Sequence, residues 1–99
     1  MTDTEILPRR LCHPRFPIGR LVITKNAFDR LNFQEIARGI SRHITGDWGH
    51  IPPDDIQANE AALVDGNRLL SAYGSGEQRF WIITEADRSV TTILLPNDY

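Results

Sequence analysis

The stretch Arg68–Leu95, RLLSAYGSGEQRFWIITEADRSVTTILL, decides the fold that this 99-residue sequence predicts. It contains three runs rich in β-branched and aromatic residues, which are Arg68–Tyr73, Arg79–Thr84 and Val90–Leu95. A Gly-Ser-Gly segment separates the first two runs, and the charged segment Glu85–Ser89 separates the last two. Short β-forming runs punctuated by turn residues are typical of an antiparallel meander. We therefore predict three consecutive antiparallel strands.

The residues before the meander predict one further strand and two helices. Ile18–Thr24 reads as a short strand that lies beside the meander, and Thr24 then caps a short helical turn through Leu31. The next helix, Asn32–Thr45, has capping-box spacing at its start and a glycine after its end. Its apolar stripe repeats at helical spacing and consists of Phe33, Ile36, Ala37, Ile40 and Ile44. Pro53–Asp65 predicts the second helix, with acidic residues in its first turn and Gly66 after its end.

These elements indicate an α+β fold of order β-α-α-β-β-β, in which two helices cover one face of the meander. The chain is long enough for one domain, which we place at residues 18–99. Residues 1–17 hold three prolines and read as a flexible leader. His43 lies at the edge of the helical stripe, where a structural role is the simplest interpretation.

The composition limits the compartment and the partners. A net charge of −2 disfavours binding to nucleic acid through overall electrostatics. The one cysteine, Cys12, has no partner for an internal disulfide, and no apolar run is long enough to span a membrane. The N-terminus has no signal-peptide core. We therefore expect a cytoplasmic protein.

The alternation within the meander places apolar residues on both of its faces. Phe80 and Ile82 fall on one face of the second run, and Trp81 and Ile83 fall on the other. Because the helices can cover only one face, we expect a protein partner or a second copy of the chain, most simply in a homodimer, to cover the other.

The segment Gly46-Asp47-Trp48-Gly49 has two interpretations. The two glycines allow a sharp turn that either presents Trp48 to a partner or buries its indole as an anchor between the helices. Asn59 is a polar residue on the core-facing side of the second helix. We predict that its amide bonds the backbone of the Gly46–His50 loop or the Trp48 indole.

The residue types that carry most catalytic chemistry are scattered. Three histidines and one cysteine show no metal-ligand spacing, and the glycines of residues 74–76 join two strands and not a strand to a helix. We predict no cofactor and no metal. The Glu85–Ser89 segment reads either as an acid/base pair beside a phosphate-binding arginine, or as a hairpin turn in which Asp87 bonds the backbone two residues on and Arg88 pairs with a neighbouring carboxylate. The residues that we expect to contact a partner are Trp48, Trp81, Asp87 and Arg88.

Several runs together resemble a family of small bacterial proteins of uncharacterised activity. The runs are GDWG, QANEAAL, GNRLLSAY and FWIITEADRSVTTILLPNDY, and the resemblance covers residues 18–99. Members are often carried on plasmids and integrative elements, and some are labelled as plasmid-related or as restriction-system subunits. The resemblance implies a cytoplasmic accessory protein of a mobile element.

The order of elements is also similar to the RelE/ParE-like toxins, which are typically basic proteins that cleave ribosome-bound messenger RNA or poison gyrase. This second resemblance implies an RNase, for which Arg68, Arg79, Glu85 and Arg88 are the available site residues. We expect a non-enzymatic binding module, and the toxin-type RNase is the alternative.

Overall fold

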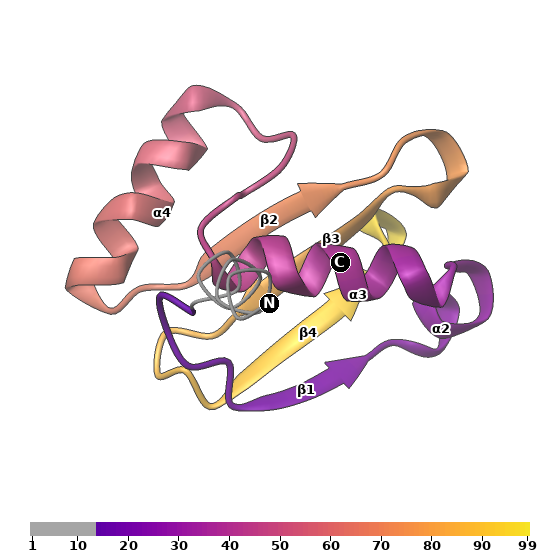
Figure 1. The fold of residues 1–99 in the computed structure, drawn as a ribbon, viewed down its shortest axis with the longest axis horizontal. Helices are drawn as coiled ribbons and strands as arrows, with labels where there is room; N and C mark the ends of the chain where they lie inside the picture. The colour runs from indigo at the N-terminus through magenta and orange to yellow at the C-terminus, as the bar shows by residue number, and fades with distance from the viewer. Residues whose placement is uncertain (1–13) are drawn as a thin grey trace, which may run out of the picture.

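The computed structural model describes residues 14–99 as an α+β fold built on one four-stranded sheet (Figure 1). The strands are β1 (Arg20–Ile23), β2 (Leu69–Tyr73), β3 (Phe80–Thr84) and β4 (Val90–Leu94). The α-helices are α2 (Lys25–Arg30), α3 (Phe33–Ile44) and α4 (Pro53–Asp65), and the short 3-10 turns are η1 (Gly76–Gln78) and η2 (Pro96–Asp98). No helix in this part of the chain combines the length and the apolar character needed to cross a membrane.

The strand order is β1-β4-β3-β2, which confirms the meander and adds one parallel neighbour. β2 and β3 pair antiparallel with Tyr73 opposite Phe80, and β3 and β4 pair antiparallel with Ile82 opposite Ile93. β1 lies beside the meander as expected, parallel to β4. The helices between β1 and β2 make up the long connection that places β1 at the far side of β4.

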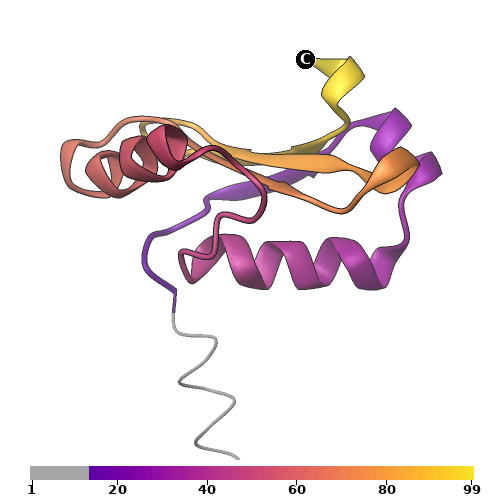
Figure 2. The same ribbon diagram turned by 90° about the horizontal axis from the view of Figure 1, so that it is seen from above.

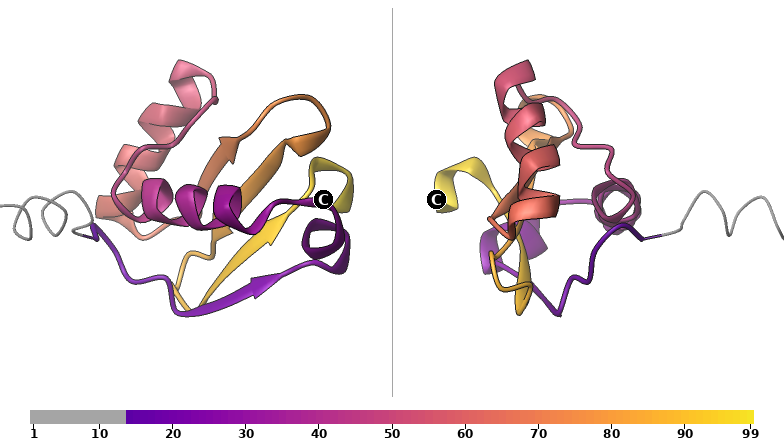
Figure 3. Two further views of the ribbon diagram at one scale, coloured as in Figure 1. Left: turned by 45° about the vertical axis from the view of Figure 1, so that its right-hand side comes forward. Right: turned by 90° about the vertical axis from the view of Figure 1, so that its left-hand side faces the viewer.

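The layers are arranged asymmetrically around the sheet. α3 lies across one face, and η2 leaves the sheet on the opposite side (Figure 2). α4 packs along the outer edge of β2, with Ala62 in a cluster that also contains Leu69 (Figures 1 and 3). α3 is therefore the helix that crosses the covered face, whereas α4 covers a sheet edge.

The predicted bounds of α3 and α4 are confirmed, and their caps explain why. The side chain of Asn32 accepts hydrogen bonds from the backbone N–H groups of Gln34 and Glu35, at 2.7 and 3.3 Å. At the other end, Asp47 N–H bonds to Arg42 O and Gly46 N–H bonds to His43 O. This is a Schellman motif, and it requires the left-handed φ of +88° at Gly46.

The buried side of α3 is rotated from the predicted apolar stripe. Phe33 is 64% exposed and Ala37 is exposed, whereas Gly39 and His43 are buried. A Cβ at Gly39 would lie 2.8 Å from Cζ of Phe80, so only glycine lets the helix approach the sheet this closely. The core side of α3 therefore runs through Ile36, Gly39 and His43. The prediction that His43 lies at the edge of the stripe is wrong.

Part of the predicted leader belongs to the folded domain. Phe16 is buried in a cluster with Trp48, and Arg15 donates from its backbone to Ile44 O and from its side chain to Glu60. The domain therefore begins before Ile18. Cys12, His13 and the rest of residues 1–13 lie outside the described residues.

The outer edge of β2 is closed by hydrogen bonds from two directions. Asn59 Nδ2 donates to Leu70 O at 2.7 Å, and Leu70 N–H donates to Asn59 Oδ1 at 3.1 Å. Two residues along the strand, Ala72 exchanges backbone hydrogen bonds with Trp48 O and His50 N–H. Asn59 thus faces the core and is hydrogen-bonded as predicted, but its partner is β2 and neither the backbone of the Gly46–His50 loop nor the Trp48 indole, which donates to Glu60.

Replacing Asn59 with alanine is expected to lower the free energy of unfolding by about 2 kcal/mol, because both backbone groups of Leu70 at this edge lose their partner. Hydrogen exchange at the Leu70 amide should become faster. Gln57→Ala, at an exposed position of α4, is the matched control and should change stability by less than about 0.5 kcal/mol. Unchanged exchange at Leu70 in the Asn59→Ala variant would contradict the assigned role.

Candidate functional site

The face of the sheet opposite α3, which we call the open face, carries the candidate site. The covered face is identified by Tyr73, Phe80, Ile82 and Ile93, which pack with Ile36 of α3. Because successive residues of a strand alternate between faces, the register assigns the strand positions that alternate with these to the open face. They are Arg20, Val22, Leu70, Ala72, Trp81, Ile83, Val90, Thr92 and Leu94 in the strands, with Arg68, Arg79 and Glu85 just beyond the strand ends.

The open face is apolar in its middle and remains partly exposed. Ala72, Ile83 and Leu94 are buried at 7%, 5% and 6% exposure. Trp81 and Leu70 are only half-buried, as are three shorter side chains on β1 and β4. A partly exposed tryptophan among apolar side chains is a feature of protein-contact surfaces.

One cluster on this face joins an aromatic pair to an ion pair. The rings of Trp81 and Tyr99 meet edge to face, with centroids 5.6 Å apart. Arg68 donates from Nη1 to the Tyr99 hydroxyl at 2.8 Å and pairs through Nη2 with Glu85 Oε1 at 3.3 Å. The charge of Glu85 and these hydrogen bonds raise the pKa of Arg68, so the guanidinium stays charged. The C-terminal tyrosine thereby folds back onto the open face and remains 71% exposed.

The open face differs in charge from the rest of the molecule. Its strand positions and their flanks carry three arginines, Arg20, Arg68 and Arg79, against Glu85, and η2 adds Asp98 on the same side (Figure 2), so arginines outnumber carboxylates there in a chain whose net charge is −2. Trp81, Arg68 and Glu85 were identified from the sequence, whereas Arg20 and Tyr99 were missed. The period-2 alternation of β1 and β3 contains the signal for Arg20, but the return of Tyr99 depends on the path of the C-terminal turn.

The four residues of the RNase hypothesis do not form one site. Arg68 and Glu85 pair at one end of the meander, but Arg79 precedes β3 and Glu85 follows it. Six residues of extended chain separate these two positions by about 20 Å. Arg88, the fourth, is held elsewhere.

Arg88 ties the β3–β4 turn to the C-terminal end of α4. Its guanidinium donates to Ala62 O at 2.9 Å and Asn67 O at 2.6 Å, and also to carbonyls of its own turn. Cationic donors stabilise the exposed carbonyls at a helix C-terminus. Arg88 has a φ of +61°, and its side chain lies over the ring of Phe16. Its contacts are structural, so the guanidinium is not available to a substrate or partner.

Asp87 and Trp48, the other two predicted contact residues, also have internal partners. Asp87 Oδ1 accepts the Ser89 N–H at 3.0 Å, as the hairpin-turn interpretation predicts, and the bonds from Ser89 lower the pKa of Asp87. The prediction that Arg88 pairs with a neighbouring carboxylate is wrong, because Arg88 bonds backbone carbonyls instead. Trp48 is 4% exposed, stacks on Phe16 and donates Nε1 to Glu60 Oε2 at 2.9 Å. Trp48 is therefore the loop anchor and not a surface contact.

A buried hydrogen-bonded chain links α3 to three strands, and its protons can be placed from the acceptors. Thr91 must donate to Ile18 O, at 2.8 Å, because a carbonyl only accepts. Thr91 then accepts from Thr84 at 2.7 Å, and Thr84 accepts from Nε2–H of His43 at 2.9 Å. A neutral His43 accepts at Nδ1 from the Ser71 hydroxyl at 2.6 Å. Every donor and acceptor of this chain, which we call the His43 chain, has one assigned role.

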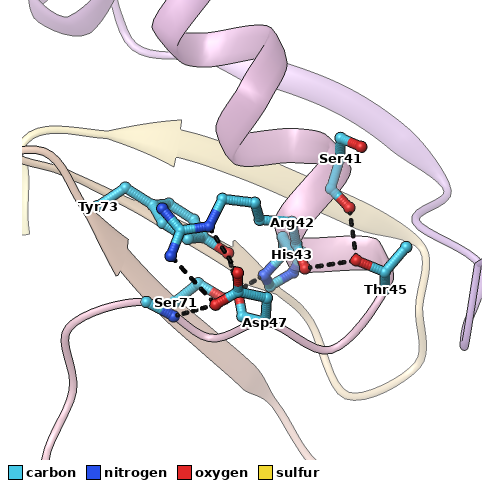
Figure 4. A network of polar contacts seen from close by, with 8 residues as sticks. Ser41, Arg42, His43, Thr45, Asp47, Ser71 and Tyr73 are labelled. Atoms are coloured by element: carbon cyan, nitrogen blue, oxygen red, sulfur yellow. Dashed lines mark hydrogen bonds and ion pairs between the residues drawn. The ribbon is translucent and has the colours of Figure 1, made fainter. Parts of the chain in front are cut away.

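Within residues 14–99, the Ser71–His43 pair resembles a nucleophile and its base. Ser71, His43 and Thr84 are each 0% exposed, so no substrate reaches them. Burial lowers the pKa of His43 to about 4, which keeps the ring neutral. The neighbouring ion pair Arg42–Asp47, at 2.7 Å, and the Tyr73 hydroxyl bonded to Asp47 O cover the end of α3 (Figure 4). The arrangement holds the helix on the sheet and has no access for catalysis.

The described residues contain no group of histidine, cysteine or carboxylate side chains that could hold a metal ion. Comparisons of the sequence with family models and with curated proteins, and of the fold with solved structures, found no match.

Proposed function

We propose that this chain is a non-enzymatic binding module that docks a protein partner on its open face. The observation that carries the proposal is the cluster of Trp81, Tyr99 and Arg68, which stays partly exposed beside the buried side chains of the open face. Tryptophan, tyrosine and arginine are the residue types that dominate the binding energy of protein interfaces. The setting that the sequence resemblance implies, an accessory protein of a mobile element, is compatible with such a role.

The charge of the open face favours an acidic partner segment. A surface on which arginines outnumber carboxylates attracts acidic side chains, and the half-buried Leu70 and Trp81 offer apolar contact between them. Nucleic acid would meet the same arginines, but the remaining surface of the chain carries an excess of negative charge that repels a polyanion. The occupant that satisfies both features is a protein segment in which acidic and apolar residues alternate.

Peptide display on the immobilised full-length chain tests this proposal. We expect the selected peptides to be enriched in Asp and Glu beside apolar residues. Their affinity should fall at least about tenfold in Trp81→Ala and in Arg68→Gln, which remove central contacts of the open face. Phe28→Ala, which removes an exposed aromatic side chain that contacts Phe33 of α3, is the control and should leave the affinity unchanged.

Three outcomes would overturn the acidic-protein proposal. They are selected peptides without acidic residues, equal binding by Trp81→Ala, and binding of a single-stranded oligonucleotide in place of peptide. Sedimentation at micromolar concentration tests the predicted homodimer. A dimer that Trp81→Ala dissociates would make a second copy of the chain the occupant, and a strict monomer would exclude it.

A further inference from the structure

A small cleft lies at the end of the sheet away from the Arg68–Glu85 pair. Its walls are Arg30 at the end of α2, the β2–β3 connection with Gly76, Glu77 and Arg79, and the segment Leu95–Asn97. The cleft has a volume of about 210 Å³, which is enough for a small polyatomic ion with its hydration water. Three segments that are far apart in the sequence thus meet around one hollow, which we call the arginine cleft.

The two arginines of the cleft differ from the other cations of the described chain. Neither Arg30 nor Arg79 forms an ion pair or a side-chain hydrogen bond within residues 14–99. Among the cationic side chains of this range, Arg20 is the only other one without such a partner. The other cationic side chains bond to a carboxylate or to backbone carbonyls, and they are Arg15, Lys25, Arg38, Arg42, Arg68 and Arg88.

The nearby carboxylates form no hydrogen bond or ion pair with either arginine. Glu77 is the one acidic residue that lines the cleft, beside the two arginines. Asp98 lies close enough for Arg30 to influence it, but its oxygens already accept hydrogen bonds from Thr24, Asn26 and the Leu95 N–H. Those bonds, from Thr24 first and with a smaller effect of Arg30, lower the pKa of Asp98.

From this arrangement we propose that the arginine cleft binds a single oxyanion, the phosphate or carboxylate group of a ligand. Two like charges that line one concave site favour an anion between them. Each guanidinium presents a planar fork of donors that matches two oxygens of a carboxylate or phosphate. This site is separate from the Trp81 cluster, and it goes beyond the proposed function.

An NMR titration of the full ¹⁵N-labelled chain tests the proposal, with inorganic phosphate and, separately, acetate as probes at constant ionic strength set by chloride. We expect saturable shifts of the Gly76, Glu77 and Asn97 amides with at least one probe. Saturation with phosphate alone assigns a phosphate group to the ligand, and saturation with acetate alone assigns a carboxylate. Saturation with both probes means that the cleft accepts either group. Arg30→Gln and Arg79→Gln should each weaken that binding at least about tenfold, the scale of one charge-assisted hydrogen bond.

Arg38→Gln is the matched control, because Arg38 is an exposed arginine whose partner is Glu35 on the same helix. It should bind the probe as the unmodified chain does. Shifts that do not saturate, or that are the same in all three variants, would overturn the arginine cleft as an anion site. The result is independent of the peptide experiment, whose variants leave Arg30 and Arg79 unchanged.

Discussion

Replacing His43 with alanine is expected to lower the free energy of unfolding by about 4 kcal/mol. The change leaves a cavity in a core where the imidazole contacts Phe16 and Trp48, and removal of a large buried ring costs about 3–5 kcal/mol. It also removes the acceptor for Ser71 and the donor to Thr84, both fully buried. A domain of this size has about 5–15 kcal/mol in total, so the variant should be close to unfolding.

Urea denaturation followed by circular dichroism measures this loss, and His50→Ala is the control. His50 is exposed, so removing its ring should change stability by less than about 0.5 kcal/mol. If His43→Ala does not fold, His43→Gln supplies the comparison, since an amide can accept from Ser71 and donate to Thr84. Equal stability of His43→Ala and the unmodified chain would show that the His43 chain does not hold α3 on the sheet.

The elements that the sequence predicted correctly are those whose signals are local. The meander follows from alternation and turn residues within 28 positions, and α3 begins and ends where Asn32 and Gly46 supply caps. The distance between Arg79 and Glu85 also follows from local information, because the residue before a strand and the residue after it lie at opposite ends of that strand. The RNase set could therefore have been rejected from the predicted topology alone.

The contacts that the sequence did not predict depend on how the elements pack. Gly39 does not belong to the apolar pattern from which the buried side of α3 was predicted. Its close approach to Phe80 nevertheless sets the rotation of α3 and buries His43. The core-facing position of Asn59 was predictable, but its partner depends on α4 lying along the edge of β2. Likewise, the carbonyls around Arg88 come from α4 and the hairpin, and no spacing in the sequence brings these together.

The same histidine should make the fold sensitive to acid in a defined pH range. Burial lowers the pKa of His43 to about 4 in the folded state, whereas a histidine in the unfolded chain titrates near 6.5. The unfolded state therefore binds the extra proton first as the pH falls. The stability that comes from the neutral ring is fully present above pH 6.5, and it decreases by about 3 kcal/mol between about pH 6.5 and 4.

This acid effect can be separated from the titration of carboxylates. Asp47, Glu60 and Asp98 also have lowered pKa values, caused first by hydrogen bonds from Arg42, Arg15 and Thr24 respectively. A carboxyl with a depressed pKa loses its stabilising effect below its unfolded value near 4, which is a lower range. Urea denaturation between pH 4 and 7 should show a slope in the unmodified chain and in His50→Gln. The slope should disappear in His43→Gln, whose amide does not titrate, and a slope retained there would assign the proton to another group.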